Sequence, residues 1–150
     1  MQPHRQVEWI IAHMALFGLL GRKHKSYASP WLQLTVVYAT ARDGLEPDAA
    51  YALRGKLLAA GSLDFEFIDA NAIVVFYPGT AAGLEAATRL ADTLREVARD
   101  KVVTAFGVAV QQGECLAQMS GSGRLATKPA GVVISQAMQL AVQEADASAR

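Results

Sequence analysis

The sequence is short of cysteine, of net charge and of long hydrophobic runs. Its single cysteine, Cys115, has no second cysteine to pair with, so a reducing, cytoplasmic compartment is expected. Cys115 also falls in an expected strand without a basic neighbour, which predicts a buried, unreactive thiol. Fourteen basic and fourteen acidic side chains cancel, which removes the long-range attraction that non-specific nucleic-acid binding needs. No nucleic-acid partner is therefore expected.

The chain is instead rich in apolar residues. Its 150 residues suit one domain, and 52% of them are hydrophobic while only 19% are charged. That is more apolar material than one core needs, so part of it is expected in an interface between subunits. We expect a globular domain over residues 31–150, preceded by a separate N-terminal helix over residues 1–25.

The N-terminal segment has helical spacing after Pro3, and apolar side chains cover most of its circumference. Its apolar run is shorter than the ~20 residues that cross a bilayer, and Glu8 and the basic residues 22–25 do not suit a signal peptide. A helix lying on a membrane surface remains open. We favour dimerisation with a second copy through five large apolar side chains: Trp9, Ile10, Met14, Phe17 and Leu20.

The remaining pattern predicts an α+β fold. Strands are expected over residues 31–39, 63–68 and 72–77, helices over 47–60, from Thr80 and over 132–147, and a hairpin over 102–119 that turns at Gln112-Gly113. This order, βαββαββα, is that of a ferredoxin-like antiparallel sheet with its helices on one face.

Two stretches resemble the class III nucleotidyl cyclases, the adenylate and guanylate cyclases. Residues 107–114 (GVAVQQGE) and 121–124 (GSGR) follow the family pattern G-I-A-I-H-T-G-E and G-S-G-R, and residues 133–141 (VISQAMQLA) follow V-I-G-D-A-V-N-L-A. Residues 35–39 (TVVYA) match the framework of the first strand. The resemblance implies a cyclase-homology domain with the ferredoxin-like core of that family.

The reactive residues of the family are replaced. Thr40 and Ala70 stand where the resemblance places the two metal-binding aspartates, and Gln139 and Gln143 stand where it places the asparagine and arginine that act across the dimer interface. Glu66 takes the position of the purine-contacting lysine, and the base-selecting aspartate falls between residues 127 and 130, where none is present. Cyclisation depends on metal ions and on cationic stabilisation of the transition state. The resemblance therefore predicts a pseudoenzyme that needs no cofactor.

Three functions follow from this pattern. The first is a catalytically inactive cyclase-homology domain that acts as a homodimeric signalling or regulatory module, with a protein partner in signalling as a further option. The second is a non-catalytic nucleotide sensor for ATP, GTP or a cyclic nucleotide. The third is an active cyclase with a displaced metal site on Asp43 and Asp69, which lie near the lost carboxylates.

One loop is a candidate for ligand binding. Gly121, Ser122 and Gly123 can present backbone N–H groups to an anion, and Arg124 and Lys128 can add positive charge. A loop of this composition between a strand and a helix is also an ordinary turn.

Overall fold

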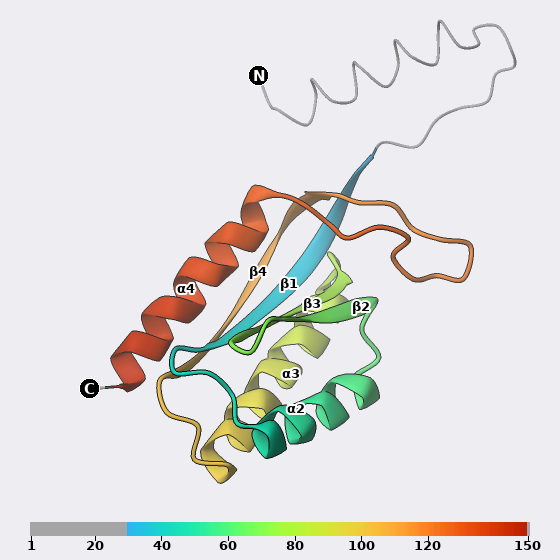
Figure 1. The fold of residues 1–150 in the computed structure, drawn as a ribbon. Coiled ribbons are helices and arrows are strands. Elements are labelled where there is room, and N and C mark those ends of the chain that lie inside the picture. The colour runs from blue at the N-terminus through green and yellow to red at the C-terminus, as the bar shows by residue number, and fades with distance from the viewer. Residues whose placement is uncertain (1–29, 150) are drawn as a thin grey trace, which may run out of the picture.

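The fold is a four-stranded antiparallel sheet with helices on both faces. The computed structural model describes residues 30–149. Along the chain it has β1 (Trp31–Ala41), α2 (Pro47–Ala59), β2 (Asp64–Ile68), β3 (Ala72–Pro78), α3 (Ala81–Asp100), β4 (Phe106–Leu116) and α4 (Val132–Ser148). The strand order is β2-β3-β1-β4, and every neighbouring pair is antiparallel. The predicted α+β class and antiparallel sheet are confirmed (Figure 1).

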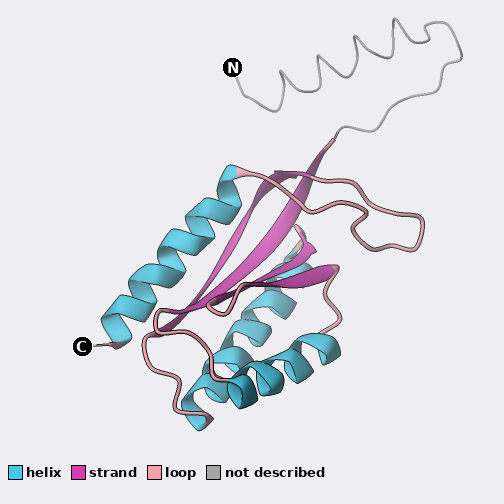
Figure 2. Ribbon diagram, viewed as in Figure 1, coloured by secondary structure: helices cyan, strands magenta, loops and turns pink. Residues whose placement is uncertain are grey.

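Strand β1 lies in the interior of the sheet and is buried on both faces. Val37 and Ala39 pack into a core with α2 and α3, whereas Val36 and Tyr38 pack into a second core with α4. Figure 2 shows α4 on one side of the sheet and the other two helices on the opposite side. The prediction that all helices share one face was therefore wrong. The unbroken apolar run of β1 already fits a strand covered on both faces.

Strand β4 is one continuous strand, so the predicted hairpin over residues 102–119 was wrong. Gly113 does not turn the chain but lies opposite Leu34 in the ladder with β1. A Cβ at Gly113 would lie 3.0 Å from Cβ of Val133 on α4, so this glycine serves close helix packing. Gln112, the other expected turn residue, donates from its amide to Thr35 Oγ1 at 2.9 Å.

After β4 the chain turns back over residues 117–131 without adding a strand to the sheet. Only two isolated bridges form in this part, Leu116 with Ala130 and Met119 with Leu125. The element order is thus βαββαβα, one strand fewer than predicted.

The other expected elements are present nearly as predicted. Helix α2 begins at Pro47, and α3 is capped by Thr80, whose hydroxyl accepts a hydrogen bond from Gly83 N at 3.0 Å.

Cys115 is fully buried in the core beneath α4, and this burial raises the pKa of its thiol to about 11. The prediction of an inert thiol in the core is supported by both observations.

The predictions on the N-terminal segment lie outside the described residues. They concern the helix and the dimerisation set Trp9, Ile10, Met14, Phe17 and Leu20. Within residues 30–149, no helix combines the length and the apolar character that crossing a bilayer requires.

Candidate functional site

The positions of the two expected metal-binding aspartates meet at one end of the sheet. Thr40, near the end of β1, lies opposite Ala72 in the ladder with β3, and its hydroxyl donates to the carbonyl of Asn71 at 3.4 Å. Ala70 lies in the turn just before β3, and its carbonyl accepts from Leu45 N at 2.9 Å. The fold therefore brings together the two positions that the resemblance paired, although their side chains offer a hydroxyl and a methyl group.

Asp69, one of the two alternative carboxylates, shapes its own turn. Its backbone has φ of 50°, and its Oδ1 accepts a hydrogen bond from Asn71 N at 2.8 Å. A side chain that bridges two residues ahead in this way stabilises a tight connection between strands. Burial and, to a lesser degree, the negative charge of Asp69 raise the pKa of Tyr38.

Asp43, the other alternative carboxylate, lies in a positively charged setting. Its Oδ2 accepts from Thr104 Oγ1 at 3.2 Å, and its Oδ1 lies 3.8 Å from Nε of Arg42. It lines an open cavity of about 570 Å³, whose wall also contains Arg42, Arg95, Arg99 and Glu144. Three guanidinium groups against two carboxylates make this cavity unfavourable for a divalent cation. Across residues 30–149, no group of three or more histidine, cysteine, aspartate or glutamate side chains is placed to hold a metal ion.

Gln139 and Gln143 lie on the outer side of α4. The helix buries a narrow stripe at every fourth position, which consists of Val133, Ala137, Ala141 and Ala145. Both glutamines are exposed, on the side that faces away from the sheet. Their amides are available to a molecule that contacts α4 from outside.

The candidate anion loop uses much of its hydrogen-bonding capacity internally. The backbone N–H of Ser122 donates to Ser120 Oγ at 3.3 Å, and that of Gly123 donates to Ser120 O at 3.1 Å. The two hydroxyls of Ser120 and Ser122 also hydrogen-bond each other at 2.7 Å. The loop thus has the contacts of a compact turn, and anion binding by Gly121, Ser122 and Gly123 stays a prediction.

The two basic residues of this loop reach strand β2. Lys128 Nζ lies 2.8 Å from Oε2 of Glu66, and Arg124 NH2 lies 3.9 Å from Oδ1 of Asp64. The first pair joins the residue at the expected lysine position to a residue in the segment expected to carry the base-selecting aspartate. Both cations face carboxylates of the same chain, which weakens the attraction that a free anion would feel. Sequence reasoning missed this pairing because 62 residues separate Lys128 from Glu66.

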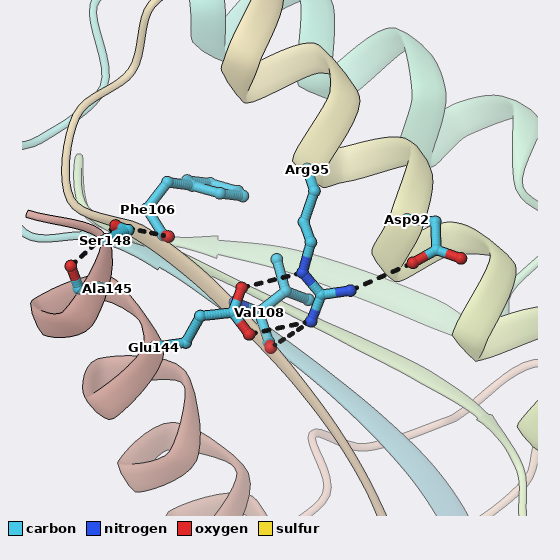
Figure 3. A network of polar contacts seen from close by, with 7 residues as sticks. All are labelled: Asp92, Arg95, Phe106, Val108, Glu144, Ala145 and Ser148. Atoms are coloured by element: carbon cyan, nitrogen blue, oxygen red, sulfur yellow. Dashed lines mark hydrogen bonds and ion pairs between the residues drawn. The ribbon is translucent and has the colours of Figure 1, made fainter.

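A polar network at the outer edge of β4 was also missed (Figure 3). Arg95 of α3 donates from Nε and NH2 to the two carboxylate oxygens of Glu144 on α4, at 2.9 and 3.0 Å. The same Arg95 donates to Val108 O at 2.9 Å, and Glu144 accepts from Val108 N at 3.3 Å. The two side chains therefore join helices on opposite faces and satisfy the edge of the strand between them.

This network changes the titration of Glu144. Partial burial alone would raise the pKa of its carboxyl group, but the hydrogen bonds and charge of Arg95, with the bond from Val108, lower the pKa overall. The sequence carries one hint of this contact. Glu144 is the first charged residue of α4, after a run from Val132 to Gln143 that has none.

The fold is similar to solved cyclase structures, although the sequence matches no protein-family model and no curated protein. The guanylyl cyclase Cya2 superposes with a TM-score of 0.53 at 13% identity, over 75% of this chain and 71% of the cyclase chain. A bacterial light-regulated adenylyl cyclase gives a TM-score of 0.47 at 10% identity, over 93% of this chain and 49% of the other. The likeness to Cya2 concerns the fold, which is that of the class III nucleotidyl cyclases, as the resemblance predicted.

Proposed function

We propose that this chain is a catalytically inactive cyclase-homology domain that acts as a homodimeric module in signalling or regulation. One observation carries the proposal. The cyclase-like fold brings Thr40 and Ala70 together at the end of the sheet where the resemblance places two metal-binding carboxylates, and neither side chain is a carboxylate.

The chemistry of cyclisation explains why this loss matters. The attacking 3′-oxygen must lose its proton while negative charge builds on the leaving pyrophosphate, and bound metal ions support both changes. The surroundings of Asp43 and Asp69 support the absence of a displaced metal site, since Asp43 lies beside Arg42 and accepts from Thr104, and Asp69 Oδ1 accepts a hydrogen bond within its own turn. Gln143, at the position of the arginine, supplies an amide and no positive charge.

Incubation of the full chain with ATP or GTP and Mn²⁺ is expected to yield no cyclic nucleotide above the level of a protein-free blank. Chromatography of the reaction mixture measures this, with an active cyclase as the assay control. A cyclic product that disappears in Asp69→Ala or Asp43→Ala, but persists in Asp100→Ala, would establish the displaced metal site and overturn the proposal. Heat released on titration with either nucleotide, without turnover, would instead favour the nucleotide sensor.

The full chain is expected to form a dimer at micromolar concentration. The apolar surplus of the sequence and the exposed apolar side chains of α4 both support association between copies. Light scattering after size exclusion should give twice the mass of one chain, and the dimer should persist at 0.5–1 M salt because little charge is involved. A strict monomer across the micromolar range would contradict the homodimeric module.

A further inference from the structure

We propose that the outer face of α4 pairs with the same face of a second copy, with the two helices antiparallel about a two-fold axis near Gln139. This α4 face consists of Ser135, Gln136, Gln139 and Gln143, flanked by Met138, Leu140 and Val142. The inference rests on the proposed homodimer and specifies its contact surface.

Helix α4 leaves most of its circumference uncovered. Only the stripe of Val133, Ala137, Ala141 and Ala145 is buried against the sheet. The apolar side chains of Met138, Leu140 and Val142 are 39–42% exposed, although they belong to a well-packed helix. Helix α2 also exposes Tyr51 and Leu58, but α4, which exposes Val132 as well, carries the most such side chains of any described element. This concentration is typical of a contact surface.

The charge pattern distinguishes α4 from α3, which also lies at the surface. The exposed positions of α3 carry charges of both signs, at Glu85, Arg89, Asp92, Glu96, Arg99 and Asp100. Between Val132 and Gln143, helix α4 carries none. Charged residues keep a helix face in water, whereas their depletion is typical of the centre of an interface.

A second copy of this chain is the partner that such a face fits. A side-chain amide has both donors and an acceptor, so a surface of glutamines is complementary to itself. An isologous interface needs this property because each copy presents the same groups to the other. A strongly charged partner would find no opposite charge here, and a fully apolar partner would bury the amides of Gln136, Gln139 and Gln143 without hydrogen bonds.

The antiparallel arrangement follows from the acidic end of the helix. Asp146 lies at the C-terminal end of α4 with its side chain 45% exposed, and its Oδ1 is 3.5 Å from NH1 of Arg42. Parallel helices would bring Asp146 of one copy close to Asp146 of the other, and the two carboxylates would repel each other. The macrodipoles of parallel helices would also be aligned and repel each other. Antiparallel helices avoid both effects. Gln139 is midway between Val132 and Asp146, which places it nearest the two-fold axis.

One pair of helices is a small contact, and the chain offers a way to extend it. Helix α4 has 17 residues and is ~25 Å long, and a single pair of this length falls short of the ~1,200 Å² of a stable interface. The first described residues of the chain lie beside the start of α4. Pro30 O accepts from Ala117 N at 2.9 Å, and Trp31 lies opposite Leu116, which bridges Ala130. The predicted dimerisation residues precede this point in the sequence and lie outside the described residues, and we expect them to supply the remaining contact area.

Disulfide trapping in the full chain tests the geometry. Gln139→Cys should form a covalent dimer on mild oxidation, since the two copies of this position meet at the axis. Two single variants serve as controls: Glu96→Cys on the exposed side of α3, and Val132→Cys at the far end of α4. Neither should cross-link with itself. The native Cys115 does not interfere because it is buried, with the pKa of its thiol raised to about 11. Equal cross-linking at positions 132 and 139 would overturn the antiparallel arrangement.

Light scattering of charged variants tests the pairing without a cross-link. Gln139→Glu places two carboxylates at the axis and should weaken the dimer at least ten-fold, whereas Leu58→Glu, on the exposed side of α2, should leave it intact. If the wild-type chain is a dimer that Gln139→Glu does not weaken, the α4 pairing is wrong and the homodimer stands. If the wild-type chain is a monomer, both fail.

Discussion

Replacing Gly107 by alanine is expected to destabilise the fold by ~3 kcal/mol or more. Gly107 lies in β4 where α4 crosses it, and an added Cβ would collide with the carbonyl oxygen of Ala141 and lie 2.5 Å from Ala145 N. Both atoms belong to the helix backbone, which cannot rotate away as a side chain can. The helix would have to lift from the sheet and expose the alanine stripe that it buries there.

Two other glycines provide matched controls for Gly107→Ala. At Gly113 the added Cβ would meet the side chain of Val133 at 3.0 Å, so Gly113→Ala should destabilise the fold less. Gly55 is exposed within α2 and has no atom within 4 Å of an added Cβ, so Gly55→Ala should stabilise the fold by ~1 kcal/mol. Urea unfolding followed by circular dichroism gives the three values. A Gly107→Ala protein as stable as the wild type would show that α4 does not pack this closely on β4.

The role of Gly113 illustrates which parts of the fold the sequence could predict and which it could not. Local patterns placed β1, both strands around Asn71 and all three described helices, because burial periodicity, Pro47 and the Thr80 cap act within a few residues. Gly113 was misassigned because its role depends on Val133, which approaches from another element. A glycine in a turn and a glycine beneath a helix are identical in sequence, and only the fold distinguishes them.

The candidate site shows the same division. The resemblance paired Thr40 with Ala70, and the fold places them together, since a motif carries information about distant contacts that local periodicity lacks. Two side-chain pairs were nevertheless missed. Lys128 with Glu66, and Arg95 with Glu144, join residues 62 and 49 positions apart through side chains that no spacing rule connects.

Replacing Arg95 by methionine is expected to destabilise the protein by ~1–2 kcal/mol at neutral pH. The change removes two hydrogen bonds to the Glu144 carboxylate and one to Val108 O, at the edge of the sheet, together with an exposed one to Asp92 on the same helix. Charge-assisted bonds of this kind contribute more when buried, but the side chains of Arg95 and Glu144 are 37% and 38% exposed, so solvent screening reduces the effect. Thermal unfolding should record a loss of ~3–8 °C.

The pH dependence of this loss identifies its cause. Arg95 helps to hold the pKa of Glu144 below its ordinary value of 4.5. The pair therefore stabilises the fold fully at pH values above 4.5, and this stabilisation disappears as the pH falls through the lowered pKa. The stability difference between the wild type and Arg95→Met should therefore be constant near neutrality and shrink in acid. Glu144→Gln should also lack the acid-sensitive contribution.

Arg89→Met is the matched control, because Arg89 lies on the same helix and pairs only with Glu85 at 3.5 Å among the ion pairs of the described residues. The side chains of that pair are 68% and 74% exposed, so its loss should change the stability by less than ~0.5 kcal/mol. Equal losses for Arg95→Met and Arg89→Met, or an Arg95→Met loss that does not change between neutral pH and pH 3, would show that the link from α3 to α4 contributes little. A larger, acid-sensitive loss for Arg95→Met alone would show that the link between Arg95 and Glu144 holds α4 to the edge of β4. The same link would then hold in place the α4 face through which we expect two copies to meet.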